Sequence, residues 1–110
     1  MEGALADRPQ ISTHVLDTHE GQPAQGVVVD LYRLLGDIEA RVGGGRTDED
    51  GRIRELLDED LESGTYRITF EVYGPFFRQA SMTFVVDDPS RSYHVPLLLA
   101  PYSLTTYRGS

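Results

Sequence analysis

The 110-residue sequence contains no cysteine, no tryptophan and no lysine. Without cysteine it cannot form a disulfide, a thiol nucleophile, a Cys-ligated zinc site or an iron–sulfur cluster, which excludes a disulfide-stapled secreted scaffold. No apolar run approaches the roughly 18 residues that cross a membrane, and the first residues lack the basic start and apolar stretch of a signal peptide. We therefore expect a cytoplasmic protein with no membrane partner.

Positive charge is also scarce, with ten arginines against 18 acidic residues and a net charge of −8. Because nucleic-acid binding depends on clustered Lys and Arg, we expect no nucleic-acid partner. The hydrophobic share of 39% is enough for one core, and the length fits one domain. We expect residues 1–10 to form a disordered lead-in and residues 11–110 to form the domain.

Hydrophobic residues recur mainly with a period of two, which is typical of half-buried strands. The clearest case begins at Tyr66, where alternate residues to Val72 are apolar and the intervening ones are polar. Similar segments cover residues 11–16, 27–31, 82–86, 93–99 and, with a Thr- and Tyr-rich composition, 103–108. Short strands with turn signals between them favour a sandwich or barrel, so we predict an all-β fold of seven or eight strands.

Glycine-containing segments separate these strands. Asp48-Glu49-Asp50-Gly51 predicts a tight turn with glycine at a position of positive φ. Gly43-Gly44-Gly45 lacks the Lys-Ser/Thr of a phosphate-binding loop, and we expect it to be a flexible link. Residues 54–62 are the only candidate for a helix, of one or two turns.

Two histidines, His14 and His94, lie on the faces of their predicted strands that point away from the apolar residues. They can meet only if the strands are neighbours or if two subunits pack there; otherwise both are ordinary surface histidines. No HxH or HExxH spacing fixes a pair of ligands, so no metal site is predicted. The sequence also lacks the GxSxG motif of serine hydrolases.

Four segments together resemble the 5-hydroxyisourate hydrolases, the transthyretin-related enzymes of urate breakdown. They are Ile11-Ser-Thr-His-Val-Leu-Asp17, Asp50-Gly-Arg-Ile53, Tyr93-His-Val-Pro-Leu-Leu-Leu99 and Thr106-Tyr-Arg-Gly-Ser110. The resemblance runs from about residue 10 to the last residue. The terminal Tyr-Arg-Gly-Ser is the feature that separates these hydrolases from hormone-carrying transthyretins.

The resemblance implies a prealbumin/transthyretin-like sandwich of two sheets and a homotetramer whose active sites lie at the interface between dimers. It implies a small-molecule substrate, 5-hydroxyisourate, which water opens at a ring acyl carbon to give 2-oxo-4-hydroxy-4-carboxy-5-ureidoimidazoline. It implies no metal and no organic cofactor.

Carried over residue by residue, the family's catalytic residues fall on His14, Arg52 and His94. The residues expected at the substrate are His14, Arg52, Tyr107, Arg108, Gly109 and Ser110. An imidazole that is neutral near pH 7 can accept a proton from water, and a guanidinium can hold an anionic ring and stabilise the oxygen that gains charge. We favour His14 as the base, with His94 orienting substrate or water.

The sequence departs from its relatives at two places. The segment 73–80 is shorter than usual, so the family's short helix is expected to be reduced or absent, and Ser103-Leu104 replaces the usual Gly-Tyr. Both changes can reshape the pocket. Two alternatives therefore stay open: a transthyretin-like hydrolase of another cyclic amide, and a non-catalytic tetramer that binds a small ligand.

Overall fold

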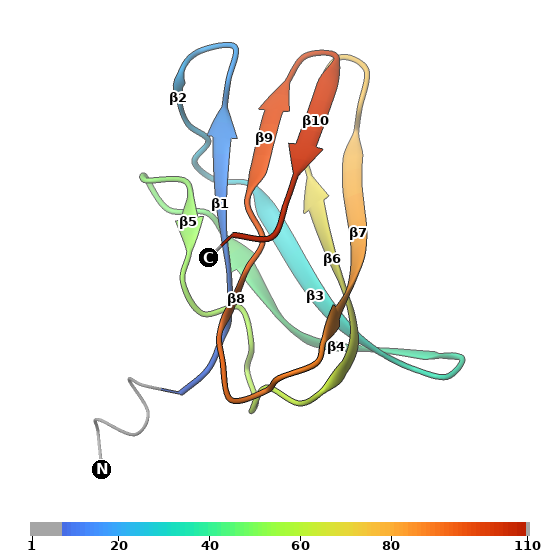
Figure 1. The fold of residues 1–110 in the computed structure, drawn as a ribbon. Coiled ribbons are helices and arrows are strands. Elements are labelled where there is room, and N and C mark those ends of the chain that lie inside the picture. Colours follow the sequence, from blue (N-terminus) through green and yellow to red (C-terminus); the bar gives the residue numbers. More distant parts are fainter. Residues whose placement is uncertain (1–7, 110) are drawn as a thin grey trace.

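The computed structural model describes residues 8–109, which form ten β-strands and contain no helix (Figure 1). The prediction of an all-β fold is confirmed, and the short helix expected to be reduced or absent is absent from this part of the chain. The separate helix candidate, residues 54–62, is not helical either: these residues form bends, and Leu57 makes an isolated bridge with Gly43. No helix in the described range is available to cross a membrane.

The strands make two sheets. The first contains β1 (Ile11–Asp17), β2 (Gln22–Pro23), β5 (Arg52–Ile53), β8 (Tyr93–His94), β9 (Leu97–Ala100) and β10 (Ser103–Thr106). The second contains β4 (Ile38–Arg46), β3 (Val28–Leu35), β6 (Gly64–Glu71) and β7 (Gln79–Val86), in that spatial order. The strand count exceeds the predicted seven or eight because three strands have only two residues and because one predicted strand is divided.

That divided strand is the segment 93–99. Pro96 has no backbone N–H to give to a ladder, and it lies between β8 and β9. Both pieces pair in parallel with β1, which therefore lies at the centre of the first sheet. Its other neighbours, β2 and β5, pair with it in antiparallel orientation.

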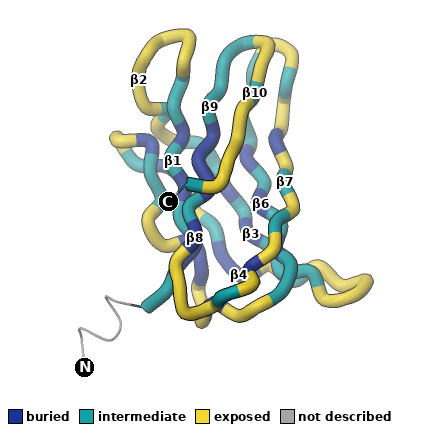
Figure 2. The backbone as a smooth tube through the Cα atoms, in the orientation of Figure 1, coloured by how far each residue is buried: buried dark blue, intermediate teal, exposed yellow. Residues whose placement is uncertain are grey.

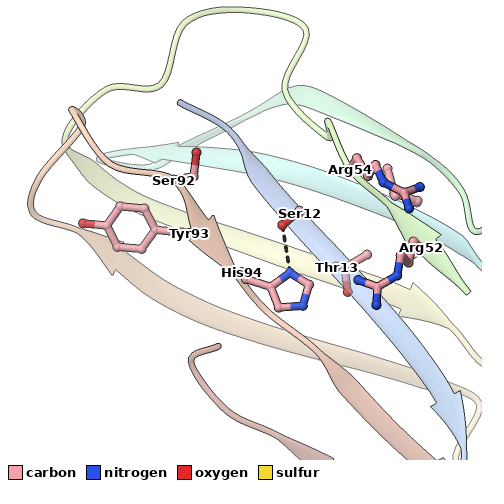
Figure 3. A pocket seen from close by; sticks show the side chains of 8 residues that line it. Ser12, Thr13, Arg52, Arg54, Ser92, Tyr93 and His94 are labelled. Atoms are coloured by element: carbon pink, nitrogen blue, oxygen red, sulfur yellow. Dashed lines mark hydrogen bonds between the residues drawn. The ribbon is translucent and has the colours of Figure 1, made fainter. Parts of the chain in front are cut away.

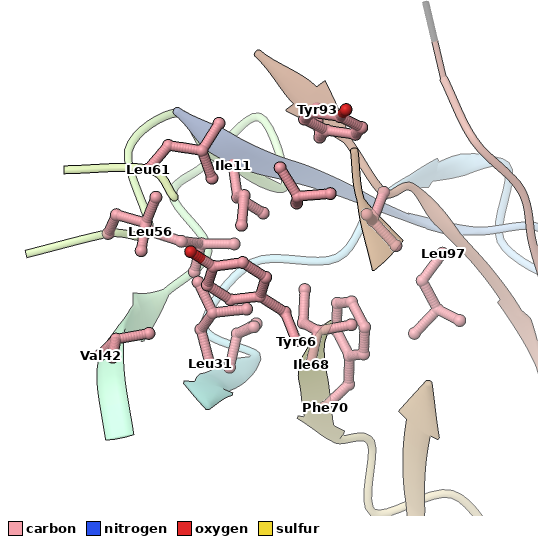
Figure 4. Close-up of a cluster of buried hydrophobic side chains, with 14 of the residues drawn as sticks. Ile11, Leu31, Val42, Leu56, Leu61, Tyr66, Ile68, Phe70, Tyr93 and Leu97 are labelled. Atoms are coloured by element: carbon pink, nitrogen blue, oxygen red, sulfur yellow. The ribbon is translucent and has the colours of Figure 1, made fainter. Parts of the chain in front are cut away.

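The two sheets enclose one hydrophobic core (Figures 2 and 4). Alternate residues of β6 and β1 point into it, as the period of two predicts; Tyr66, Ile68, Phe70, Ile11 and Val15 have no exposed surface. Full burial of each such side chain contributes on the order of 1.5–3 kcal/mol. The opposite faces of the same strands point away from the core and can therefore present polar side chains.

The glycine run 43–45 is part of β4, so the prediction of a flexible link is wrong. A Cβ on Gly43 would lie 1.7 Å from the Leu56 carbonyl oxygen. Gly44 has a φ of 150° and donates its N–H to that carbonyl at 2.9 Å. The glycines therefore allow the chain at Leu56 to approach the strand closely.

The predicted lead-in of residues 1–10 overlaps the fold at its end; residues 1–7 lie outside the described range. Gln10 is buried, and its side-chain oxygen accepts hydrogen bonds from the backbone N–H of Leu57 at 2.9 Å and of Ile11 at 3.1 Å. Its amide nitrogen donates to the Leu57 carbonyl at 3.0 Å. The ordered domain therefore begins before Ile11.

The shortened segment between β6 and β7 is a tight connection. Tyr73 donates its N–H to the Arg78 carbonyl at 3.1 Å, and Gly74 donates to the Phe77 carbonyl at 2.9 Å. Tyr73 has a φ of 48°, which is uncommon for a residue other than glycine. This connection contains no helical turn.

Candidate active site

Strand β1 brings the candidate residues together because it pairs with β5 and with β8. In the β1–β5 register His14 faces Arg52, and in the β1–β8 register Ser12 faces His94. Paired residues project to the same face of a sheet. All four side chains therefore lie on the outward face of the first sheet, opposite the core. The condition that the histidine strands must be neighbours is met within one chain.

A local turn explains why Arg52 is held there. The Asp48 carboxylate accepts hydrogen bonds from the backbone N–H of Asp50 and of Arg52, both at 2.9 Å. Gly51 has a φ of 74°, as the turn prediction required, and its carbonyl accepts the N–H of Val15 at 2.7 Å. A Cβ on Gly51 would lie 2.4 Å from the Val15 carbonyl oxygen. The turn thus needs glycine immediately before Arg52.

The Asp48 carboxylate is the electrostatic partner of this turn. The pKa of Asp48 lies below the ordinary value, mainly because its carboxylate accepts the hydrogen bond from the Arg52 backbone. The hydrogen bond from Asp50 and the nearby Arg54 cation lower this pKa to a lesser extent. Arg54 forms an ion pair with Asp48 at 3.3 Å. Arg52 has no ion pair with an acidic residue of the described chain, so its guanidinium is available to an anionic ligand.

His94 is fixed from both sides of β8. On one side its Nδ1 lies 2.8 Å from the Ser12 hydroxyl oxygen (Figure 3). On the other side its carbonyl accepts the N–H of Gly109 at 2.8 Å. The next residue, Val95, donates its N–H to the Ser12 carbonyl at 2.9 Å. Both the backbone and the ring of His94 are thereby positioned.

A cavity of about 280 Å³ lies over this part of the sheet, between His94 and Arg52 (Figure 3). Its lining residues are Ser12, Thr13, Arg52, Ile53, Arg54, Ser92, Tyr93 and His94. His14 is not one of them; it lies one position further along the outward face of β1, opposite Arg52. Two arginines give the cavity a positive character suited to an anionic ligand.

The pKa of His94 is lowered, which favours the neutral imidazole. Burial lowers its pKa from the ordinary value near 6.5, and the positive charge of Arg52 and the proximity of His14 act in the same direction. A hydrogen bond with the Ser12 backbone acts the other way and is outweighed. A neutral imidazole can donate a proton from one nitrogen and accept at the other.

The C-terminal tail leaves the β-ladder earlier than predicted, since β10 ends at Thr106 and not at residue 108. Tyr107 and Arg108 line a second, more apolar cavity of about 210 Å³, together with His94 and residues of β7. The Arg108 guanidinium lies 4.6 Å from the centre of the Tyr93 ring. These two residues therefore flank His94 on the side away from Arg52. Ser110 lies outside the described residues.

Arg108 is also tied to an acidic residue through Tyr93. The Tyr93 hydroxyl donates to the Asp87 carboxylate at 2.7 Å, and this bond, with a smaller contribution from the Arg108 charge, lowers the pKa of Asp87. Arg108 thus stacks on a buried tyrosine that precedes His94 in β8. In the described structure it secures the tail to the sheet.

Sequence reasoning did not single out Ser12 or Arg54. Ser12 shares the outward face of β1 with His14, so the period of two alone places it on the same side. Its contact with His94 depends on strand pairing, which a single sequence does not reveal. No group of three His, Cys, Asp or Glu residues within 8–109 is arranged to hold a metal ion.

The model of the HIUase/Transthyretin family matches residues 11–109, and the chain belongs to this family. The 5-hydroxyisourate hydrolase of Deinococcus radiodurans is 41% identical over 119 aligned residues, covering 96% of this chain and all of that protein. The structure of Klebsiella pneumoniae 5-hydroxyisourate hydrolase superposes with a TM-score of 0.79 at 35% identity, covering 91% of this chain and 98% of that one.

A transthyretin is equally close in shape. Sea bream transthyretin in complex with thyroxine superposes with a TM-score of 0.83 at 28% identity, covering 90% of this chain and 93% of the other. The two-sheet transthyretin-like sandwich is therefore confirmed. Because a 5-hydroxyisourate hydrolase and a thyroxine-bound transthyretin share this fold, function has to be argued from the site.

Proposed function

We propose that this protein hydrolyses 5-hydroxyisourate in urate degradation. Water adds to a ring acyl carbon, the ring C–N bond breaks, and the nitrogen leaves with a proton. The product is 2-oxo-4-hydroxy-4-carboxy-5-ureidoimidazoline. The nearly full-length similarity to 5-hydroxyisourate hydrolases from several bacteria supports this assignment.

The observation that carries the proposal is the convergence of His14, Arg52 and His94 on one face, where β1 pairs with β5 and β8. Three polar residues from distant parts of the chain meet beside a small cavity. A carrier of an aromatic ligand has no need of two imidazoles beside a guanidinium. Such a set provides a base, a proton donor and a fixed positive charge.

Each of the three residues has a separate role in the proposed reaction. His14 accepts the proton of the attacking water, and His94 donates a hydrogen bond that orients the substrate. Arg52 holds the anionic heterocycle and stabilises the negative charge that develops on the carbonyl oxygen. Tyr107 and Arg108 contribute to substrate binding from the other side of His94, where they line the second cavity.

The direct test is to generate 5-hydroxyisourate from urate with a urate oxidase and to follow its decay by absorbance. The decay is expected to accelerate in proportion to protein concentration, and Arg52→Ala is expected to remove the acceleration. An unchanged decay rate with wild-type protein would overturn the proposal. Other cyclic amides, added in the same assay format, test the alternative of a related hydrolase.

The same proposal includes assembly into a homotetramer with the sites at the interface between dimers. Leu16 and Leu98 are partners in the β1–β9 register and project from the same outward face as His14. Both are only partly buried in the single chain. Apolar side chains beside a polar site are better covered by protein than by water, which supports an interface on this face.

The rival function is non-catalytic binding of a small ligand, which the close superposition on thyroxine-bound sea bream transthyretin favours. The two functions differ in stoichiometry. A carrier binds its ligand at a fixed ratio and leaves it unchanged, whereas the hydrolase consumes many equivalents of substrate. Calorimetry with thyroxine, alongside the decay assay, separates them.

A further inference from the structure

We propose that Ser12 is a positioning residue for His94. The Ser12 hydroxyl holds the His94 imidazole so that Nε2 carries the proton and faces the cavity. The expected effect of Ser12 on the rate of hydrolysis rests on the proposed function, whereas its expected effect on the tautomer of the His94 ring does not. The family resemblance assigned no role to this serine.

The geometry is direct. The Ser12 oxygen and His94 Nδ1 lie 2.8 Å apart, within normal hydrogen-bond length, across an 82-residue separation in sequence. Both residues are partly buried and both line the cavity that contains Arg52 (Figure 3). Since Nδ1 is engaged by the serine, Nε2 is the nitrogen left for a ligand.

The hydroxyl is not needed to join the two strands. The Ser12 carbonyl already accepts the N–H of Val95 at 2.9 Å, and the Thr13 hydroxyl donates to the Val95 carbonyl at 2.6 Å. On the far side the His94 carbonyl accepts the N–H of Gly109. Loss of the Ser12 hydroxyl therefore leaves β8 in place and releases only the ring.

The 2.8 Å contact does not by itself say which atom donates, so the direction is part of the proposal and rests on the available partners. A neutral imidazole has one donor nitrogen and one acceptor nitrogen, and a serine hydroxyl has one hydrogen to donate. Within residues 8–109 the Ser12 hydroxyl has no other hydrogen-bond acceptor than His94 Nδ1. In the neutral ring, donation to Nδ1 uses that hydrogen and leaves the imidazole proton on Nε2. The bond to the Ser12 backbone that raises the pKa of His94 belongs to the protonated ring, in which both nitrogens donate.

This arrangement gives the cavity two donors from different strands, His94 Nε2–H and the Arg52 guanidinium. Donors that are fixed before the reaction stabilise the oxygen that gains charge, because no reorganisation is needed. His94 in this tautomer has no free acceptor nitrogen facing the cavity. The role of base then falls on His14, whose backbone lies opposite Arg52.

The test compares Ser12→Ala with Ser12→Thr, which keeps a hydroxyl and suits a strand. Ser81→Ala is the matched control, because Ser81 is an exposed strand serine of the second sheet. Two-bond ¹H–¹⁵N spectra at pH 8 report the tautomer of each histidine, and His94→Asn identifies the His94 signal. Steady-state kinetics with 5-hydroxyisourate and the pH profile of kcat/KM are measured on the same proteins.

For wild type and Ser12→Thr we expect the Nε2–H tautomer, and for Ser12→Ala a mixture of tautomers. We expect kcat to fall about 10- to 100-fold in Ser12→Ala with little change in KM, the range found when a partner orienting a functional histidine is removed. Ser12→Thr should recover most of the rate, and Ser81→Ala should match wild type.

An Nδ1–H tautomer in wild type, or an unchanged tautomer in Ser12→Ala, would overturn the inference. So would a changed tautomer with undiminished kcat, since the ring would then be oriented without consequence. If wild-type protein shows the expected tautomer and does not hydrolyse 5-hydroxyisourate, the proposed function fails and the placement of the His94 ring by Ser12 stands.

Discussion

His14 and Arg52 face each other directly across the antiparallel pairing of β1 and β5. The guanidinium is always charged at physiological pH, so it disfavours a second positive charge nearby. The same cation lowers the pKa of His94, the partner of Ser12 on the other side of β1. One arginine therefore lowers the pKa of His94 and, in the proposed reaction, also binds the substrate.

Replacing Arg52 with alanine should lower kcat/KM by about 100-fold or more, the scale of losing a group that stabilises developing negative charge. Arg52→Lys should recover only part of the loss, because an ammonium does not reproduce the planar fork of donors. Arg41→Ala is the control, since Arg41 pairs with Asp30 in the second sheet at 2.9 Å. Near wild-type turnover in Arg52→Ala would show that Arg52 has no role in the reaction.

The His94 pKa predicts a pH dependence of stability. Because the folded-state pKa lies below the ordinary 6.5, the unfolded chain binds more protons than the folded chain as pH falls below about 6.5. Stability should therefore decrease as pH is lowered through that window. The fall in Tm from pH 7.5 to 5.5 should be smaller in His94→Asn than in wild type.

The control for this measurement is His19→Asn, because the His19 side chain is 66% exposed. It should show the same change in Tm between the two pH values as wild type. An equal change in His94→Asn would mean that the imidazole does not contribute to the acid sensitivity of the fold.

The tail contact predicts a sharp effect at Gly109. A Cβ at this position would lie 2.6 Å from His94 Cδ2 and 3.2 Å from His94 Cγ, so the ring or the tail must move. Gly109→Ala should lower kcat about 10-fold or more, the low end of losing a positioned acid–base group, while Tm changes little because chain ends contribute little to stability.

Deletion of residues 107–110 is the coarser form of this test. It should abolish turnover while far-UV circular dichroism still shows a β-protein, and a C-terminal tag should impair activity more than an N-terminal one. Full activity of the truncated protein would show that the tail has no role in catalysis.

Within the glycine run of β4, replacement by alanine is expected to destabilise the protein at Gly43 and to be tolerated at Gly45. Gly43→Ala should lower the free energy of unfolding by more than about 2 kcal/mol, because the new Cβ overlaps the Leu56 carbonyl. Gly45→Ala should be tolerated, since its Cβ would meet the Ile53 side chain at an ordinary 3.7 Å. Urea denaturation of both variants measures the difference, and equal stabilities would show that the approach of Leu56 is not constrained.

The proposed tetramer predicts that the 12.3 kDa chain sediments at about four times its mass at micromolar concentration. Leu98→Glu places a charge on the outward face beside Leu16 and should dissociate the assembly, since an unpaired charge is costly to bury. Leu35→Glu is the control, because Leu35 lies 48% exposed at the end of β3 in the other sheet. A wild-type monomer would contradict the assembly.

The long strands and the outward placement of His14 and His94 follow from the sequence period, because alternation records which face is buried. The segment 54–62 could not be predicted in the same way. Leu56, Leu57 and Leu61 are buried there without forming a regular element. Their backbone is satisfied by distant groups, for example by the bond from the Leu56 N–H to the Ile11 carbonyl at 3.0 Å.

The candidate site was predictable as a set of residues only through the family resemblance. Nothing in the period of β1 shows that Ser12 lies opposite His94, since register is decided by tertiary pairing. The same limit applies to the tail. Its composition predicted a strand to residue 108, whereas Gly109 turns back to form an isolated bridge with His94.

The parallel pairing of β1 with β8 also constrains the order of events in biosynthesis. Ser12 and His94 are 82 positions apart, so β1 is synthesised long before its parallel neighbours β8 and β9 exist. Closing so long a loop costs entropy before any contact repays it, and topologies of this kind fold slowly. Until then the edge of β1 that pairs with β8 and β9 has no native partner, and an unpaired strand edge favours aggregation of the nascent chain.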